Sequence, residues 1–263
     1  MRMYSSIPRE GCFRMKVVIL AAGYGTRLYP YTKNFPKPLL DVKGRPIIEY
    51  LLHKLERRSD VSKVIVVTNS RFYKHFVYWK KSVRTRLVLE IVNDLSKSPK
   101  DKLGAIKDME LVFKKEGYKG DFLVLGGDNF FKGWLDGFIR FAQRKSPGIT
   151  IGAVDIGDKK QARHYGVLRM GKTKRILEFQ EKPEAPKSTL VAMCLYYFPS
   201  VKVPLVKRYL ADPGNYRDAV GAYIKWLIAH DEVFGFRFRS LWFDIGRVDT
   251  YITLNRLLSK RRE

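Results

Sequence analysis

Short apolar runs alternate with amphipathic segments along most of this chain. The runs that predict buried strands are rich in Val, Ile and Leu and span residues 17–20, 63–68, 87–92, 122–125, 150–154, 190–197 and 233–237. Apolar residues at helical spacing predict helices at 46–55, 72–81, 103–115, 134–145, 201–209, 218–230 and 250–260, and 93–102 reads as a loop. The alternation indicates right-handed βαβ units, so we expect an α/β fold with a mixed, mostly parallel sheet flanked by helices.

The pattern changes after Val154, where two short strands flank the turn 171–174 and predict a small β-rich lobe. The strand at 233–237 is expected to pair with the stretch that ends at Gly246. Asp249 is expected to cap the final helix, which would close the sheet. Helix 218–230 needs no role beyond packing, because an apolar face at this spacing usually belongs to a core.

The first strand ends in a loop with almost no side-chain bulk, formed by Ala21, Ala22, Gly23 and Gly25. Backbone N–H groups in such a loop can approach a bound group closely, and an anion is their natural ligand. Thr26 and Arg27 follow at once, and Lys37 stands between two prolines. A Gly-x-Gly turn alone is common, and the spacing completes neither the dinucleotide fingerprint nor a P-loop. With its two cations, the stretch predicts a site for a triphosphate.

Charge and composition restrict the remaining possibilities. The 263 residues carry a formal net charge of +25, which attracts polyanions and keeps a nucleic-acid-binding protein as an alternative. The basic residues are scattered, however, and no helix-turn-helix, RRM, KH or zinc-finger pattern occurs, so nucleic acid is the less favoured partner.

No apolar run is long enough to span a membrane, and residues 1–14 lack the apolar core of a secretory signal. We expect these residues to form a disordered extension before a domain at 15–263. Cys12 and Cys194 show no metal or redox spacing, and a reduced cytoplasm fits them.

The opening stretch resembles the N-terminal motif of the sugar-1-phosphate nucleotidyltransferases. Their pattern G-x-G-T-R-L-x-P-x-T, then P-K-P-L and a proline-started helix, reads here as 23–32, 36–39 and Pro46. The resemblance implies that the nucleotide is bound by Ala22, Gly23, Gly25, Thr26 and Arg27. It also implies that Arg27 and Lys37 act as catalytic cations on the phosphates.

Two aspartates match the positions of the metal ligands in this family. Asp128 lies in Gly126-Gly127-Asp128-Asn129, which taken alone would be a turn or helix-cap aspartate. In the family such a G-D motif supplies the first magnesium ligand, and a W-x-D-x-G motif, here 242–246, supplies the second, which implies Asp244. The expected cofactor is therefore Mg²⁺.

A third group of motifs resembles the family's sugar-binding half. Y-G-V and E-K-P read here as 165–167 and 181–183, although Glu-Lys-Pro alone would usually be a solvated strand end. Glu181 would accept hydrogen bonds from sugar hydroxyls, and Lys182 would neutralise the sugar phosphate and act as a further catalytic cation. The sugar-phosphate residues implied by the resemblance are Gly166, Glu181, Lys182 and Tyr196. We place the nucleotide-binding half at 15–155 and the sugar-binding half at 156–263, and no hexapeptide repeat predicts a left-handed β-helix domain.

The chain departs from the family pattern in two places. In the loop that reads the base, Asn93 and Gly104 are the expected contacts, with Asp94 beside the first, but the usual Glu or Gln and one glycine are missing. Cys194 stands before Leu195-Tyr196, where the family often has glycine.

We expect the protein to transfer a nucleotidyl group from an NTP, dTTP or UTP, to a sugar 1-phosphate, giving an NDP-sugar and pyrophosphate. A catalytically weak, regulatory nucleotide-sugar-binding protein is the alternative within the family. The sequence leaves a homo-oligomer open.

Overall fold

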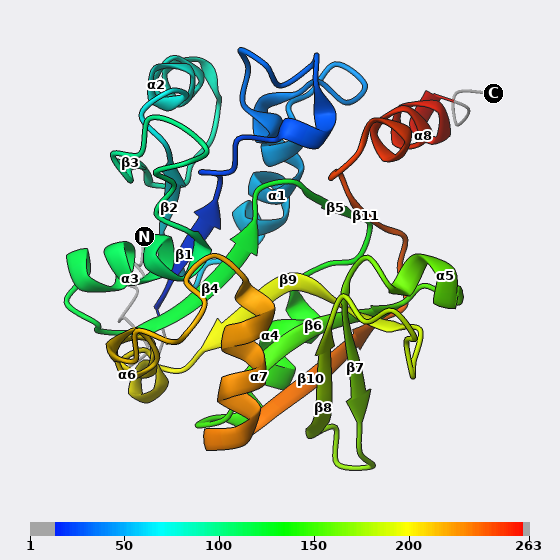
Figure 1. Ribbon diagram of the computed structural model, residues 1–263. Coiled ribbons are helices and arrows are strands. Elements are labelled where there is room, and N and C mark those ends of the chain that lie inside the picture. The colour runs from blue at the N-terminus through cyan, green and yellow to red at the C-terminus, as the bar shows by residue number, and fades with distance from the viewer. Residues whose placement is uncertain (1–13, 260–263) are drawn as a thin grey trace, which may run out of the picture.

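The computed structural model describes residues 14–259, and a nine-stranded sheet forms its centre (Figure 1). Its main path runs β10-β6-β9-β4-β1-β2-β3. These strands are β1 (Met15–Leu20), β2 (Val61–Thr68), β3 (Leu89–Asn93), β4 (Asp121–Gly126), β6 (Ile149–Asp155), β9 (Leu190–Phe198) and β10 (Val233–Phe238). Only β9 among them pairs antiparallel with both its neighbours, so the expected mixed, mostly parallel sheet is confirmed.

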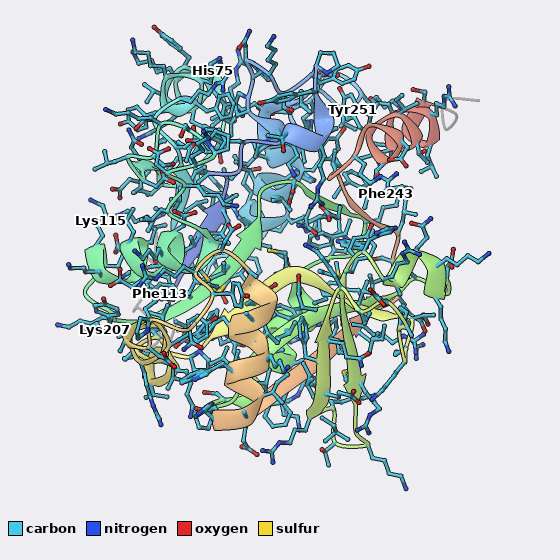
Figure 2. All side chains as sticks on the ribbon, in the orientation of Figure 1. His75, Phe113, Lys115, Lys207, Phe243 and Tyr251 are labelled. Atoms are coloured by element: carbon cyan, nitrogen blue, oxygen red, sulfur yellow. The ribbon has the colours of Figure 1, made fainter. Side chains whose placement is uncertain are left out.

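Helices cover both faces of this sheet. One apolar cluster packs α1 (Ile47–Glu56), α2 (Tyr73–Ser82) and α4 (Asp136–Lys145) on one face, and another packs α3 (Ala105–Lys115), α6 (Leu205–Ala211) and α7 (Val220–His230) on the other. Phe113 of α3 is fully buried in the second cluster, whereas Lys115 and Lys207 project from exposed positions on α3 and α6 (Figure 2). No helix within residues 14–259 is both long and apolar enough to cross a membrane.

The predicted β-rich lobe is a hairpin of β7 (Gly166–Met170) and β8 (Ile176–Glu181), preceded by the short α5 (Lys159–Ala162). The hairpin joins the main sheet where β7 meets β9, and α7 packs against β8. A pocket can therefore form between the hairpin, the sheet and α7.

The prediction for the last strands is wrong. β11 (Trp242–Asp244) does not pair with β10 but runs antiparallel to β5 (Asn129–Phe131). The free edge of β6 takes β10 as a parallel partner, and the apolar residues that follow cross to a separate cluster under α8 (Val248–Ser259). This helix packs on β11 rather than closing the main sheet, and Asp249 lies inside its first turn.

The parallel strands end at one edge of the sheet. Leu20 at the end of β1 pairs with Gly126 at the end of β4 and with Val67 near the end of β2. Loops that follow these strands therefore meet, and in open α/β sheets this edge is where ligands bind. Residues 1–13, most of the expected N-terminal extension, and Lys260 lie outside the described residues.

Candidate active site

The glycine loop, residues 21–27, is held open by contacts to its backbone. The Asn69 side-chain amide donates a hydrogen bond to the carbonyl oxygen of Ala22 at 2.8 Å. Gly25 has φ +62°, and Thr32 Oγ1 donates to its carbonyl oxygen at 2.6 Å. A Cβ at Gly25 would lie 3.1 Å from the Thr32 side chain, so both the backbone conformation and the space favour glycine.

Three charged side chains meet beside this loop: Lys37, Asp128 and Asp244. Lys37 Nζ lies 2.5 Å from Asp128 Oδ2. The pairing of β11 with β5 places Asp244 opposite Asn129, and the backbone N–H of Ile245 donates to the carbonyl oxygen of Asp128 at 3.1 Å. Asp128 and Asp244, which are far apart in the sequence, are thus brought together by a two-stranded sheet.

Burial and the neighbouring charges shift the pKa values of Lys37 and Asp244. Burial alone lowers the pKa of Lys37, but the charges of Asp128 and Asp244 outweigh it and raise the pKa above its ordinary value. Burial also raises the pKa of Asp244, and the neighbouring charge of Asp128 raises it further. The positive charges of Lys37, Lys182 and Arg27 act in the opposite direction and lower the pKa of Asp244. A bound metal ion would favour the ionised form of both carboxyl groups in the same way.

The donor set fits a magnesium ion. Mg²⁺ prefers oxygen ligands and is usually held by one or two carboxylates together with water and phosphate oxygens. Among residues 14–259, no group of three or more His, Cys, Asp or Glu side chains converges as a complete metal site. Asp128 and Asp244 would thus provide part of the coordination and leave the rest to substrate oxygens.

A pocket of about 330 Å³ lies next to the two aspartates, between the β7–β8 hairpin, β9 and α7. Both aspartates line it, and so do the four residues expected to bind the sugar phosphate: Gly166, Glu181, Lys182 and Tyr196. The sequence motifs that pointed to sugar and to metal therefore meet in one cavity.

Two unusual positions shape this sugar-side pocket. A Cβ at Gly221 of α7 would lie 1.8 Å from Glu181 Oε2, so glycine allows the helix to approach that carboxylate. Cys194 has φ +51°, in the left-handed region that favours glycine, at the position where the family pattern often has one. Burial raises the pKa of its thiol to about 12, which keeps Cys194 protonated.

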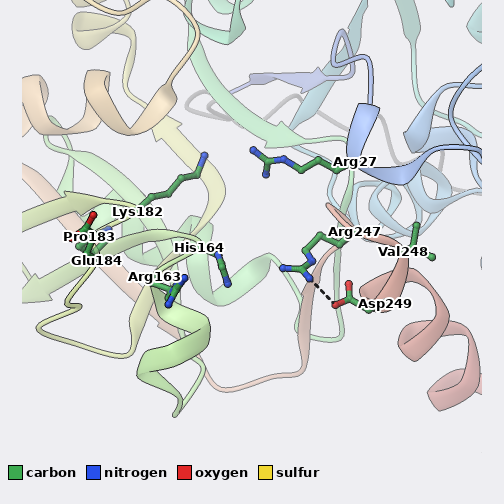
Figure 3. A pocket seen from close by; sticks show the side chains of 9 residues that line it. All are labelled: Arg27, Arg163, His164, Lys182, Pro183, Glu184, Arg247, Val248 and Asp249. Carbon is green, nitrogen blue, oxygen red and sulfur yellow. Dashed lines mark ion pairs between the residues drawn. The ribbon is translucent and has the colours of Figure 1, made fainter.

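A larger, positively charged cavity of about 1050 Å³ opens beside the sugar-side pocket (Figure 3). Arg27 and Lys182 extend into it from opposite sides, and the sequence analysis did not identify its other cations, Arg163 and Arg247. Arg247 lies 3.4 Å from Asp249, whereas Arg27 and Arg163 form no ion pair within the described part of the chain. Free guanidinium groups converging on one space favour a polyanionic ligand.

On the other side of the glycine loop lies a pocket of about 230 Å³, which we call the base-side pocket. Its lining includes Ala22, Gly23, Tyr24, Gly25, Thr26, Asp94, Lys102, Gly104, Asp108 and Asp218. Gly104 has φ +92°, and a Cβ there would lie 2.7 Å from the Arg217 carbonyl oxygen. The expected base contact Asn93 does not line this pocket, because its side-chain oxygen accepts from Ser70 Oγ and the Leu95 N–H.

Sequence reasoning missed Asp108 and Asp218 in the base-side pocket, and Arg163 and Arg247 in the large cavity. Asp108 lies on a helix that the periodicity already explained, so no local signal separated it from a core or surface position. The chain has 51 Lys and Arg residues, so nothing in the sequence distinguished Arg163 and Arg247 from basic residues on the surface.

Comparison with known proteins finds relatives that match most of this chain. A relative in Methanocaldococcus jannaschii, "Bifunctional protein GlmU", is 28% identical over 93% of this chain and 54% of its own length. A "Glucose-1-phosphate adenylyltransferase" of Rhodopirellula baltica is 27% identical over 90% of this chain and 58% of its own length. The chain spans about half the length of such curated relatives.

Solved structures share the fold. A "UDP-glucose pyrophosphorylase complexed with UDP-glucose" superposes with a TM-score of 0.79 at 19% identity, covering 95% of this chain and all of that one. A "Putative Glucose-1-Phosphate Thymidylyltransferase from Bacillus anthracis" gives 0.78 at 22% identity, covering 92% of this chain and 94% of that one. The family model described as "Nucleotidyl transferase" matches residues 16–261, and with it the chain belongs to the nucleotidyl transferase family.

Proposed function

We propose that this protein transfers a nucleotidyl group from UTP or dTTP to a sugar 1-phosphate in a Mg²⁺-dependent reaction, releasing pyrophosphate. The observation that carries the proposal is the meeting of Asp128, Asp244 and Lys37 between the glycine loop and the sugar-side pocket. An activity that joins two phosphorylated substrates needs cations and metal-binding oxygens at that position.

The reaction needs no protein nucleophile. An anionic oxygen of the sugar 1-phosphate attacks the α-phosphorus of the NTP, a new P–O bond forms, and the bond from that phosphorus to the α,β-bridging oxygen breaks. The electron pair leaves with pyrophosphate. Magnesium held by Asp128 and Asp244 would supply charge neutralisation between the two phosphates.

The chain's own residues bring the two anions together. The glycine-loop amides and Arg27 bind the β- and γ-phosphates, while Lys37 lies close to the α-phosphate and Lys182 approaches from the sugar side. Glu181 orients the sugar by accepting from its hydroxyl groups. Bringing the substrates together in line and stabilising the negative charge together account for the catalysis.

The test is pyrophosphate release by the purified protein with UTP, dTTP and other NTPs against several hexose 1-phosphates. We expect release only when NTP, sugar phosphate and Mg²⁺ are all present. Binding of a nucleotide sugar without any turnover would instead indicate the regulatory alternative and would contradict the proposal.

A further inference from the structure

Two arginines of the large cavity, Arg163 and Arg247, lie outside the motifs for phosphate, metal and sugar. They line the same space as Arg27 and Lys182 (Figure 3). The cavity, of about 1050 Å³, is larger than the sugar-side pocket of about 330 Å³. Room and positive charge for a further anionic group therefore lie beside the place proposed for the sugar phosphate.

The acids of this cavity do not neutralise its cations. Two carboxylates, Glu184 and Asp249, line it together with four Lys and Arg side chains. Asp249 contacts Arg247 at 3.4 Å, but the side chains of Arg247 and Asp249 are 58% and 65% exposed, so this ion pair is weak. The cavity keeps a net positive charge, which favours a ligand with several negative charges.

Arg247 is held beside the glycine loop by an apolar cluster. Asp244 ends β11, and the next residue, Ile245, is fully buried. Ile245 belongs to the same cluster as Leu28, the residue that follows Arg27. The segments that carry Arg27 and Arg247 are therefore fixed on one apolar base.

Arg163 is held from the sugar side. It stands two residues before Tyr165, whose ring packs against Trp242 of β11 with the ring centroids 5.2 Å apart. The Lys182 N–H donates a hydrogen bond to the Tyr165 carbonyl oxygen at 3.1 Å. The backbone near Arg163 is thus joined both to Lys182 and to the strand that carries Asp244.

The course of the glycine loop directs the end of a triphosphate toward this cavity. Gly23, Gly25 and Thr26 line the base-side pocket, and the next residue, Arg27, lines the large cavity. A nucleotide that begins in the base-side pocket and follows the loop amides therefore extends its β- and γ-phosphates toward the cavity. The sugar phosphate approaches from the sugar-side pocket, and in phosphoryl transfer the attacking and leaving oxygens lie roughly in line. Pyrophosphate then needs a space apart from the sugar, which the large cavity offers.

We propose that Arg163 and Arg247, together with Arg27, bind the pyrophosphate group as it leaves. This deepens the proposed function, on which it rests. When the bond from the α-phosphorus to the α,β-bridging oxygen breaks, the electron pair stays on that oxygen, so the leaving group gains negative charge. Guanidinium groups form paired, charge-assisted hydrogen bonds to phosphate oxygens and stabilise this form more than the bound NTP. In the reverse reaction the same arginines bind the incoming pyrophosphate.

The experiment measures the reverse reaction, in which the purified full chain forms NTP from pyrophosphate, Mg²⁺ and the nucleotide sugar of the most active substrate pair. Arg163→Ala and Arg247→Ala each raise the KM for pyrophosphate about tenfold, while the KM for the nucleotide sugar stays unchanged. Arg247→Lys keeps the charge without the planar guanidinium group, so its KM rises less than that of Arg247→Ala. Arg140→Ala and Arg144→Ala are matched controls, because they remove the same charge from exposed positions of α4 that do not line the cavity, and both keep the wild-type KM.

An unchanged KM for pyrophosphate in Arg163→Ala and Arg247→Ala would overturn the inference, and so would an equal rise in the two controls. If the arginines instead bind a second anionic group on the sugar, these variants weaken inhibition by glucose 1,6-bisphosphate and leave the KM for pyrophosphate unchanged. Should no substrate pair turn over, the proposed function fails. Calorimetric Kd values for magnesium pyrophosphate then decide the inference: weaker binding by Arg163→Ala and Arg247→Ala than by the controls supports it, and equal binding overturns it.

Discussion

Asp108 allows a stability prediction whose sign and size follow from its surroundings. Burial raises its pKa to about 8 in the folded protein, and the charges of Asp94 and Asp218 add to this; the ordinary value is 3.8. At about 1.36 kcal/mol per pH unit, this difference amounts to roughly 6 kcal/mol of lost stability once both states are ionised. Water entry and local relaxation in the native state reduce the cost, so we expect roughly 2–3 kcal/mol to be measurable.

The pH window follows from the two pKa values. Below pH 4 the carboxyl group is protonated in both the folded and the unfolded chain, so its titration does not lower the free energy of unfolding. Between pH 4 and 8 the unfolded chain loses the proton while the folded chain keeps it, so the free energy of unfolding falls as pH rises. Above pH 8 both states are ionised and the loss stays constant.

Asp108→Asn removes this titration while it preserves the size of the side chain. The variant is expected to exceed the wild type in free energy of unfolding by an amount that grows from pH 5 to pH 8 and then levels off. Guanidinium unfolding followed by circular dichroism at several pH values measures the difference. Parallel stability curves for the two proteins across this window would refute the reasoning.

Four further substitutions test separate parts of the site. Lys37→Ala and Asp128→Asn are each expected to lower kcat at least a hundredfold with the far-ultraviolet spectrum unchanged. The first removes a cation that opposes phosphate repulsion, and the second removes a carboxylate proposed to hold the magnesium ion; turnover near the wild-type rate would contradict their assignment. Gly221→Ala is expected to displace the Glu181 carboxylate and raise the KM for the sugar phosphate at least tenfold, with the NTP KM as the control. Gly25→Ala forces a side chain into a left-handed conformation against a neighbouring side chain, and we expect a loss of about 1–2 kcal/mol together with a higher NTP KM; unchanged thermal unfolding would count against the strain.

Much of the fold could be predicted from local sequence patterns. The apolar runs at β1, β2 and β4 and the periodicity of α1 and α3 have local causes, so element type and parallel topology could be predicted. The partner of Trp242–Asp244 could not, because a three-residue strand holds no register information, and β5 was too short to be recognised at all. The pairing of β10 with β6 depended on which sheet edge remained free, a property of the assembled sheet.

In the candidate site, too, residues within a local motif could be predicted, whereas residues brought there by tertiary packing could not. Gly23, Gly25, Arg27 and Lys37 fall within one contiguous motif, and the resemblance could identify them together. Asp108 lines the base-side pocket because the loop after β3 places α3 beside the glycine loop. Tertiary packing determines that placement, so the local sequence could not reveal it.

The most direct test of the account is pyrophosphate release across a grid of NTPs and hexose 1-phosphates, each pair with and without Mg²⁺. The account predicts release for UTP or dTTP with at least one sugar phosphate, lost on omission of any one component and lost in Asp244→Asn. Release that continues in Asp244→Asn, or that proceeds equally without a sugar phosphate, would contradict it.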